Sequence, residues 1–458
     1  MLFGLDSKWR PGVNDQFDFS IQRQLPNQTV LEVGYIGRWA RHLFLGMDAN
    51  AVPTMLKLGG QTFAQAYYSL WQANQAGTAP TAVAPAPFFE TALGSGYVGS
   101  YNAAANKYNT KNAGSAGFVP APTCATATCA VLASEGGGPL GTNNIGTENP
   151  FGMFTDMDGS WGFPGCSGCS ILPSDTQAAA LDMSTTNGYS NYQAAIISVQ
   201  KRAGQGLTLS GNFTWSHSLN TIGINQEYVE ASPNNIHDLS SDYGPAPWDR
   251  RFVVNLLASY ELPFGHGQRF SVGNGILDRL IGGWQFAPLF TWATGIPIET
   301  YTGSCDEFGA GNIPWCSGAV PLAGAMSAGT TPHMNVQTTD NIGSNNDVKN
   351  GGTGGNLFSN PSAVYKEYRA ALLGLDTNSY DLGPFHGQHR WDLSFDLAKD
   401  TRITESQGIT ISAQFLNAFN HMMYNDPSMN LQGPGDWGTL TSQYNNPRVI
   451  ELGLRYHF

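Results

Sequence analysis

The sequence has little charge. Only 12% of its 458 residues are Asp, Glu, Lys or Arg, about half the share found in ordinary soluble proteins. Such a chain has few charges with which to solvate a large surface, yet 12% of its residues are aromatic, which is too many for a disordered polymer. No block of Lys or Arg occurs and the formal net charge is −12, so binding to nucleic acid is not expected.

Long apolar runs are also missing. No stretch of about 18 apolar residues occurs, which excludes a membrane-spanning helix. Residues 1–10 lack the apolar core of a secretory signal peptide. If the protein is exported, as argued below, we expect that the signal peptide is absent from this chain, because it has been either removed or left out.

Cysteines are few, and all six lie in sequence-close pairs: Cys124 and Cys129, Cys166 and Cys169, and Cys305 and Cys316. Each pair lies in a segment predicted to be a loop. Local pairs in exported loops favour structural disulfides formed in an oxidising compartment, with free thiols as the alternative. A redox or zinc motif at Cys166 and Cys169 would need a βαβ setting or a second Cys/His pair at ligand spacing, and the sequence offers neither.

The sequence does contain segments in which apolar and polar residues alternate. At its end, one face of a predicted strand carries Ile450, Leu452, Leu454, Tyr456 and Phe458, and the other face carries Val449, Glu451, Gly453, Arg455 and His457. Because successive side chains of a strand point to opposite sides, this pattern predicts an amphipathic strand. The same pattern recurs in 17–22, 31–35, 195–200, 207–215, 252–262, 284–292, 391–397 and 409–420. Together these segments predict about nine strands, each near the length that crosses a bilayer.

Two environments could bury one face of such strands: the interior of a soluble sandwich or barrel, and a lipid bilayer. Three features favour the bilayer. The polar faces carry Asn, Gln, Ser and Thr rather than Lys and Glu, and aromatic residues mark the strand ends. In addition, short links at 26–28, 203–206, 263–278 and 404–408 alternate with long links at 46–188, 219–248, 301–386 and 421–447. Turns and loops sorted in this way are typical of outer-membrane barrels.

The predicted fold is therefore all-β: a segment of an antiparallel transmembrane β-barrel with short periplasmic turns and long extracellular loops. The largest loop insertion is 46–188, and we expect one helix within it, at 61–72. A second long extracellular loop is expected at 301–386.

Ten short runs then occur in a characteristic order, at 19–26, 32–37, 192–202, 212–218, 249–252, 260–265, 282–285, 294–297, 390–394 and 414–421. With these runs the chain resembles the Oar-like TonB-dependent receptors of the outer membrane. The resemblance implies a barrel of about 22 strands. It also implies a preceding signal peptide, a carboxypeptidase-regulatory-like domain, a TonB box and a plug, none of which is visible in the sequence. We therefore expect residues 1–458 to be the C-terminal part of the barrel.

The expected function follows from that resemblance. The chain would be a fragment of a bacterial outer-membrane transporter or receptor for the uptake or passage of a large, unidentified substrate; the alternative is a passive porin or a surface adhesin. Expected partners are outer-membrane lipid, TonB (through the missing plug region) and the barrel-assembly machinery. The assembly signal would be the alternating residues Ile450, Leu452, Leu454, Tyr456 and Phe458.

No catalytic constellation is recognisable, and neither an enzyme nor a cofactor or metal site is expected. The glycine-rich run at 136–141 follows no strand and is interrupted by Pro139, so a flexible loop is expected there. Residues 156–159 begin like a calcium loop but lack the third acid and the distal Glu, so a solvated turn is expected there. His217 has no acidic residue or second histidine close in sequence and is expected to be a polar anchor at the membrane interface. For 249–251, a structural charge pair is favoured over a substrate contact.

Overall fold

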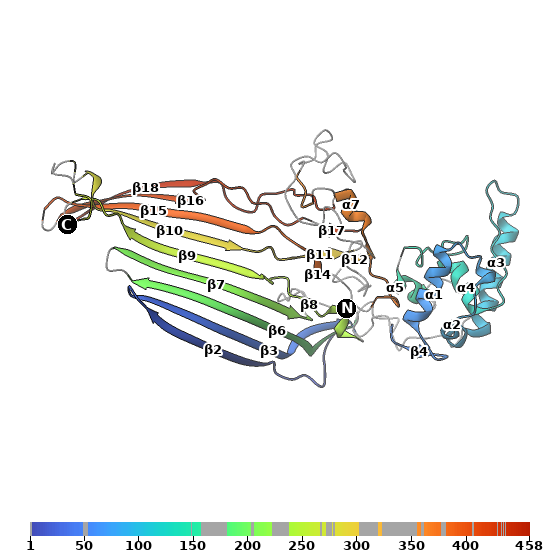
Figure 1. The fold of residues 1–458 in the computed structure, drawn as a ribbon. Helices are drawn as coiled ribbons and strands as arrows, with labels where there is room; N and C mark the ends of the chain where they lie inside the picture. Colours follow the sequence, from blue (N-terminus) through green and yellow to red (C-terminus); the bar gives the residue numbers. More distant parts are fainter. Residues whose placement is uncertain are drawn as a thin grey trace.

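One large, mostly antiparallel sheet dominates the computed structural model (Figure 1). The structure describes residues 2–48, 54–147, 149–156, 181–202, 206–221, 238–265, 268–271, 277, 280–301, 319–322, 355–358, 361–376, 382–404, 407–427, 429–431, 433, 435 and 437–458. None of the helices in these ranges combines the length and the hydropathy needed to cross a bilayer.

Nine strands of the main sheet follow one another in the order β18-β16-β15-β10-β9-β7-β6-β3-β2. Their bounds are β2 Val13–Leu25, β3 Thr29–Asp48, β6 Leu181–Arg202, β7 Leu207–Asn220, β9 Phe252–Glu261, β10 Trp284–Ala293, β15 Arg390–Arg402, β16 Gly408–Leu416 and β18 Val449–His457. Two short strands complete the 11-stranded sheet: β1 (Leu2–Leu5) pairs with β6 and β8 (Gly244–Pro245) pairs with β7. Each of the nine alternating segments identified in the sequence coincides with all or most of one strand of the main path.

The pairing register aligns the alternation of neighbouring strands into rows. One row across the sheet consists of Ile21, Val33, Ile197, Phe213, Val254, Trp292 and Trp391. The adjacent row, which points to the opposite face, consists of Gln22, Glu32, Ser198, Asn212, Asn255, Thr291 and Asp392. One face of the sheet is therefore apolar and the other polar.

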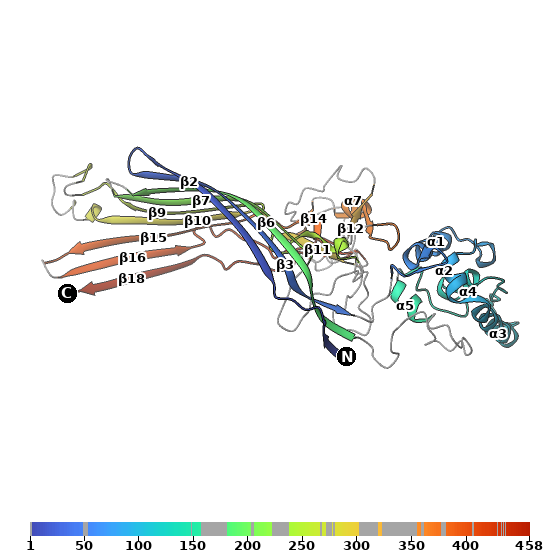
Figure 2. The ribbon, with the colours of Figure 1, turned by 90° about the horizontal axis from the view of Figure 1, so that it is seen from below.

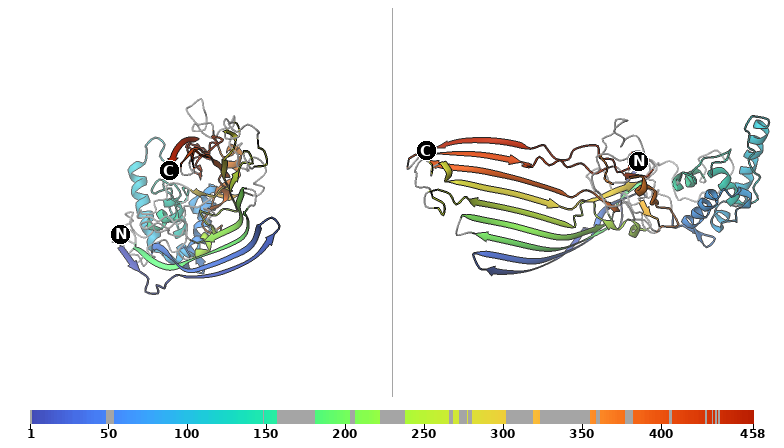
Figure 3. Two further views of the ribbon diagram at one scale, coloured as in Figure 1. Left: turned by 90° about the vertical axis from the view of Figure 1, so that its left-hand side faces the viewer. Right: turned by 45° about the horizontal axis from the view of Figure 1, so that its top comes forward.

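The apolar face is not packed against protein in the part of the chain that the structure describes. Leu452 and Leu454 are 81% and 77% exposed, and Ile21 is 61% exposed. An apolar surface of this extent is unfavourable in water, and it indicates contact with a nonaqueous phase. The sheet is curved but does not close (Figures 2 and 3), and β2 and β18 lie at the two ends of the path.

One strand ends earlier than its pattern predicted. The alternation extends to Asn420, but β16 ends at Leu416 because Asn417 and Asn420 adopt left-handed backbone conformations, with φ of 48° and 51°. The side chain of Asn417 then organises the chain that leaves the strand: Nδ2 donates to the carbonyl oxygens of His421 and Asn446, each at 3.0 Å.

Residues 54–156 fold into a helical unit rather than an extended loop (Figures 1 and 3). Its elements are β4 Lys57–Leu58, β5 Gln61–Thr62, α1 Phe63–Gln75, the 3-10 turn η1 Pro80–Ala82, α2 Pro87–Ala92, α3 Gly94–Asn112, α4 Ala127–Glu135 and α5 Pro150–Thr155. The expected helix at 61–72 corresponds to α1, which begins at Phe63 because Thr62 caps it. Oγ1 of Thr62 accepts from the amide of Gln65, and Oε1 of Gln65 accepts from the amide of Thr62.

The helical unit has a core of its own. α1 contributes Phe63, Ala66, Tyr67 and Leu70, which share one face at helical spacing. α3 contributes Tyr97, Tyr101 and Ala105 at intervals of four residues. All nine residues of α4 are buried, so α4 is the central helix of the unit.

A smaller cluster forms from the second long loop and its neighbours. Its elements are β11 Pro297–Tyr301, β12 Ala319–Pro321, α7 Pro361–Lys366, β13 Tyr368–Ala370, β14 Leu382–His386 and β17 Met429–Asn430. The 3-10 turn η3 Leu239–Asp242 lies between β7 and β8. Strand β11 pairs with β14 and β17, and β12 pairs with β13. Trp437, Phe358 and Phe385 are at the centre of this second core.

Turns and loops are sorted to opposite ends of the sheet. Figure 1 shows the turn between β2 and β3 at the same end as the C-terminus, with the helical unit and the cluster of β11, β12 and α7 at the other end. We call these the turn end and the loop end. In the β2–β3 turn, Asn27 and Gln28 have φ of 60° and 57°, the left-handed conformation that a tight hairpin requires.

Candidate functional site at the loop end

A buried carboxylate connects two neighbouring strands at the loop end. Nδ1 of His217, near the end of β7, lies 2.9 Å from Oδ2 of Asp249, which precedes β9. The amide of Ser218 donates to Oδ1 of Asp249 at 2.7 Å. The side chain of Asp249 is only 3% exposed. His217 therefore has an acidic partner that is distant in sequence: the two residues are 32 positions apart and meet because β7 and β9 pair. Its role as a polar anchor at the membrane interface stays a prediction.

A second histidine lies close to this pair. His386 ends β14, and its charge environment is set by Asp249, Arg251 and His217. The loops around the ring lower the pKa of His386 by removing water, although the residue as a whole is exposed. The nearby charge of Asp249 opposes this shift, and those of Arg251 and His217 add to it.

Two guanidinium groups lie near the carboxylate of Asp426, and one of them bonds to it. Nη2 of Arg390 donates to Oδ2 of Asp426 at 2.9 Å, and both side chains are mostly buried. The guanidinium of Arg390 also lies 3.8 Å from the ring centre of Tyr444, within the range of a cation–π interaction. Nη1 of Arg250 donates to the carbonyl oxygen of Thr294 at 2.7 Å.

The pKa values of this group follow from burial and from mutual repulsion. Burial raises the pKa of Asp426, while Arg390 and Arg250 act in the opposite direction. Burial lowers the pKa of Arg250, and the positive charge of Arg390 lowers it further. Arg250 and Arg390 together have one more charge than Asp426 neutralises, so this part of the loop end is locally positive in an acidic chain.

Close approach of the loops is needed to assemble these groups. Gly387 follows β14, and a Cβ atom there would collide with the carboxylate of Asp426; one on Gly295 would collide with the backbone of Gly387. The glycines therefore let the link after β10, the end of β14 and the Asp426 loop meet. Sequence reasoning selected 249–251 and His217, but it missed His386, Arg390 and Asp426 as members of the same group.

The chemistry available here is binding by charge and hydrogen bonds. Among the described residues, no group of three or more His, Cys, Asp or Glu side chains could hold a metal ion. The group contains both signs of charge, an aromatic ring and imidazoles, and such a combination suits recognition of a polar ligand at the mouth of the sheet.

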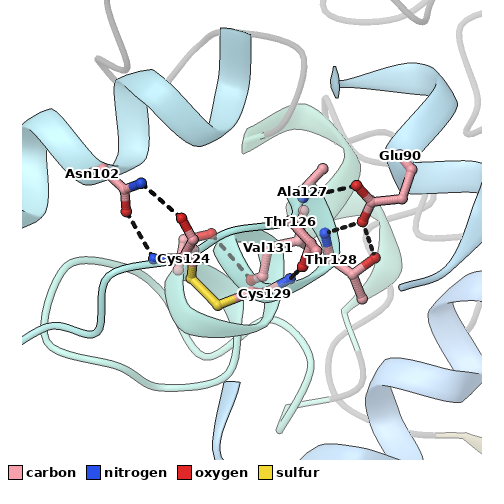
Figure 4. Close-up of a disulfide and its surroundings, with 9 residues drawn as sticks. Glu90, Asn102, Cys124, Thr126, Ala127, Thr128, Cys129 and Val131 are labelled. Carbon is pink, nitrogen blue, oxygen red and sulfur yellow. Dashed lines mark hydrogen bonds between the residues drawn. A yellow bond between two sulfur atoms is a disulfide. The ribbon is translucent and has the colours of Figure 1, made fainter. Parts of the chain in front are cut away.

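The helical unit at the same end is fastened by a disulfide and by side-chain clamps (Figure 4). Cys124 and Cys129 form the disulfide, as predicted for that pair. Asn102 of α3 holds Cys124 from both sides: Nδ2 donates to its carbonyl oxygen and Oδ1 accepts from its amide, each at 2.8 Å. Glu90 of α2 accepts from the amides of Ala127 and Thr128 at the first turn of α4, where a negative charge is favourable. Cys166, Cys169, Cys305 and Cys316 lie outside the described residues.

Two carboxyl groups face each other inside the helical unit. Glu135 ends α4 and Asp156 follows α5; they are 2% and 5% exposed. Oγ1 of Thr142 lies 2.7 and 3.0 Å from one oxygen of each, and Nδ2 of Asn144 lies 2.7 and 2.8 Å from the same two oxygens. Burial raises the pKa of Glu135 to about 7, and the pKa of Asp156 is raised for the same reason.

A segment of the second long loop joins the two loop-end cores, and we call residues 368–376 the tie. Tyr368 belongs to the smaller core, whereas Leu372 and Leu373 are buried in the core of the helical unit. The guanidinium of Arg369 donates to both carboxylate oxygens of Asp376, at 2.6 and 2.9 Å. Figure 1 shows the chain after α7 reaching the helical unit. The two long loop segments therefore form one connected assembly.

The last strand, β18, has the apolar face that the sequence predicts. Ile450, Leu452, Leu454 and Tyr456 pair in register with the apolar residues of β16, and the rings of Tyr456 and Phe458 lie 6.0 Å apart. Their role as an assembly signal stays a prediction.

Comparison with known protein families identifies the family of this chain. Residues 1–451 match the family described as outer membrane beta barrel domain. The chain belongs to that family. It is therefore located in the bacterial outer membrane, and the apolar face of its sheet is the one that contacts lipid.

Among solved structures, this barrel chain is similar to three outer-membrane proteins. The transporter YddB from Escherichia coli matches with 7% identity and a TM-score of 0.38, over 99% of this chain and 33% of that one. The ferripyoverdine receptor of Pseudomonas aeruginosa matches with 7% identity and a TM-score of 0.35, over 99% and 29%. The FrpB iron transporter from Neisseria meningitidis matches with 6% identity and a TM-score of 0.32, over 99% and 32%. The chain spans about a third of the length of these structures. No curated protein matches the sequence significantly.

Proposed function

We propose that the protein is a TonB-dependent outer-membrane transporter or receptor of the Oar-like type, and that it takes up or passes a large substrate rather than catalysing a reaction. The family assignment over residues 1–451 supports a barrel wall. The ordered runs that resemble Oar-like receptors, from 19–26 to 414–421, span most of that wall.

The observation that carries the proposal is the connected assembly at the loop end. The helical unit and the smaller core are joined by the tie, and the groups around Asp249 and Arg390 lie at the ends of the strands beneath them. A pore for free diffusion needs no such structure, whereas a receptor for a bulky substrate needs an ordered surface for first contact. In this proposal the loop end is extracellular and the turn end periplasmic.

The wall described here would be part of a larger barrel. β2 and β18 each have one strand neighbour among the described strands, and an unpaired edge is unfavourable in hydrocarbon because its peptide groups find no hydrogen-bond partners. We propose that further strands close the barrel, to about 22 in total, and that TonB acts through a plug held inside it.

Planar-bilayer recordings test the proposal. The full-length protein, purified from outer membranes, should give no steady conductance, because a plug would fill the lumen. A stable open channel at low voltage would instead support a passive porin.

Energy coupling separates a transporter from a surface adhesin. In the native host, disabling TonB should produce the same growth or uptake defect as deletion of the gene, and the double mutant should be no worse than either. A deletion phenotype that is unchanged by TonB would contradict the proposed coupling.

A further inference from the structure

The lipid-facing side of the sheet has an uneven distribution of charge. The pairing register defines which residues of each strand belong to the apolar face. At the turn end this face carries three cations, Arg23 on β2, Lys201 on β6 and Lys399 on β15. We call these three residues the turn-end basic belt.

No acidic residue accompanies the belt on this face in the described strands. The one acid there, Asp15, lies at the loop end and pairs with Arg41 at 2.6 Å. The remaining acids of the main strands, such as Glu32, Glu261 and Asp400, belong to the polar face. The belt is therefore positive in an otherwise acidic protein, and Arg23 and Lys201 are its accessible members, because Lys399 is only 7% exposed.

Two members of the belt, Arg23 and Lys201, lie on the two strands that flank β3. Arg23 pairs in register with Leu31 of β3, and Lys201 pairs with Thr29 of the same strand. Their positions are therefore separated by β3 and by two residues along the strand direction. Within the described residues, neither side chain makes a salt bridge or hydrogen bond. Arg23 is exposed and Lys201 is half-buried.

An unpaired cation on a lipid-facing strand is unfavourable at the bilayer midplane, by roughly 2–4 kcal/mol, and nearly neutral at the interface. Arg and Lys reach the interface by extending their charged ends toward the headgroups. The turn-end position of the belt meets this requirement. Headgroup phosphates are the partners that a guanidinium and an ammonium group can share there.

The third member of the belt borders a groove. Lys399 pairs in register with Trp284 and Ile411, and its amine bonds to the carbonyl oxygens of Leu280 and Gly282. The groove, of about 310 Å³, is lined by Trp284, Leu397, Ile411, Ala413, Leu452 and Leu454 of the apolar face, together with Ser412 and Gly453 of the polar rows. Ala413 has a small side chain among larger apolar ones, which leaves space in the groove. The mostly apolar lining of the groove suits an acyl chain.

We propose that the turn-end basic belt binds anionic phospholipid, with the headgroup phosphate between Arg23 and Lys201, and that a lipid acyl chain occupies the groove beside Lys399. In the orientation proposed above, these lipids belong to the periplasmic leaflet. The inference itself depends on the lipid-facing surface and not on transport, so a failure of the TonB experiment would leave it standing.

The test compares lipid preference in variants of the full-length protein. Nanodiscs containing phosphatidylglycerol and phosphatidylcholine in equal amounts are assembled around the protein, and native mass spectrometry counts the lipids that remain bound after release from the disc. The wild type should retain phosphatidylglycerol preferentially. The double variant Arg23→Gln/Lys201→Gln should lose most of this preference, roughly fivefold for each cation removed. High salt should weaken the preference in the wild type and leave the variant unchanged.

Matched variants guard against a general effect of charge or folding. Arg455→Gln removes a cation from the polar face of β18 near the same end and should keep the wild-type preference. Ala413→Leu fills the groove and should remove one retained lipid without changing the headgroup preference. Equal retention of both lipids by the wild type, or an unchanged preference in the double variant with a native β-sheet circular dichroism spectrum, would overturn the proposal.

Discussion

Asp249 illustrates how much of the loop end depends on single buried side chains. Its two carboxylate oxygens serve different partners, the imidazole of His217 and the amide of Ser218. Because the side chain is 3% exposed, water cannot easily replace it as an acceptor. The contact is therefore worth more than an exposed ion pair of similar geometry.

Replacing Asp249 with Ala should lower the free energy of unfolding by about 2 kcal/mol, because a buried amide and an imidazole would lose their acceptor. Urea unfolding in detergent measures this change. Asp15→Ala is the control, since the Asp15–Arg41 pair is more than half exposed and should contribute little. Equal effects of the two substitutions would show that the buried contact has no special role.

The Glu135–Asp156 pair predicts a dependence on pH. In the unfolded chain the Glu135 carboxyl has an ordinary pKa of 4.5, and in the folded protein its pKa is about 7. The folded state therefore holds the proton more tightly, so stability is complete below pH 4.5, falls as pH rises through 7, and then levels off. The raised pKa corresponds to roughly 3 kcal/mol.

The variant Glu135→Gln should remove most of that dependence and make the helical unit more stable than the wild type at pH 8. Hydrogen exchange of α4 and α5 at pH 5 and pH 8 reports on it. Asp156 adds a dependence of the same sign, because burial raises its pKa as well. Tyr97 and Tyr101 stay neutral over this range because burial raises the pKa of both, that of Tyr101 to about 12. A wild-type unit that becomes more stable with rising pH would contradict this assignment.

At the scale of elements, the strands could be predicted from sequence and the loop-end units could not. Alternation depends on the bilayer and the lumen, which act equally on every strand, so the period of two is visible in each segment. Strand ends depend on single residues such as Asn417, whose left-handed conformation no periodicity reveals. α4 was missed because it is buried on all sides and therefore has no amphipathic pattern to detect.

The tie was invisible for another reason. Leu372 and Leu373 belong in sequence to the second long loop, but they complete the core of a unit that is encoded about 300 residues earlier. The same limit applies to the candidate site. The sequence singles out both His217 and Asp249, but it does not reveal that their side chains are in contact. Predicting either contact requires knowing which strands and loops meet.

Gly374 offers a way to test the tie as an element. Its φ of +85° is a conformation that other residues adopt with strain, and a Cβ there would collide with the carbonyl oxygen of Ala64. Gly374→Ala should therefore release the tie from α1 and speed hydrogen exchange of α1 by at least tenfold, which corresponds to about 1.4 kcal/mol of local stability.

The matched control is Gly114→Ala, which has a similar positive φ but no atom near its Cβ position. This control should change exchange only locally, near its own turn. If both variants have the same effect on α1, backbone strain rather than the tie would explain it.

For the whole molecule, the assignment of one face to lipid has a direct test. Leu452 is 81% exposed on the apolar face of β18, and replacing it with Arg should oppose insertion by roughly 2–4 kcal/mol if this position lies near the bilayer midplane. Folding yield in liposomes, read from protease protection and gel mobility, measures the effect.

The control places the same charge on the opposite face. Ser412 of β16 pairs with Gly453 in the polar rows, and Ser412→Arg should insert nearly as well as the wild type because its side chain reaches the aqueous lumen. Equal tolerance of Arg at both positions would exclude the proposed orientation of the sheet.

The separation of apolar and polar rows has a consequence for assembly. Side chains alternate with a period of two, so a slip of one residue between β2 and β3 would transfer Glu32 and its polar row to the membrane side and Val33 to the lumen. Each misregistered strand would carry several polar groups into hydrocarbon. The bilayer thus discriminates against faulty pairings during insertion, and it imposes a selection for correct register that water alone would not apply.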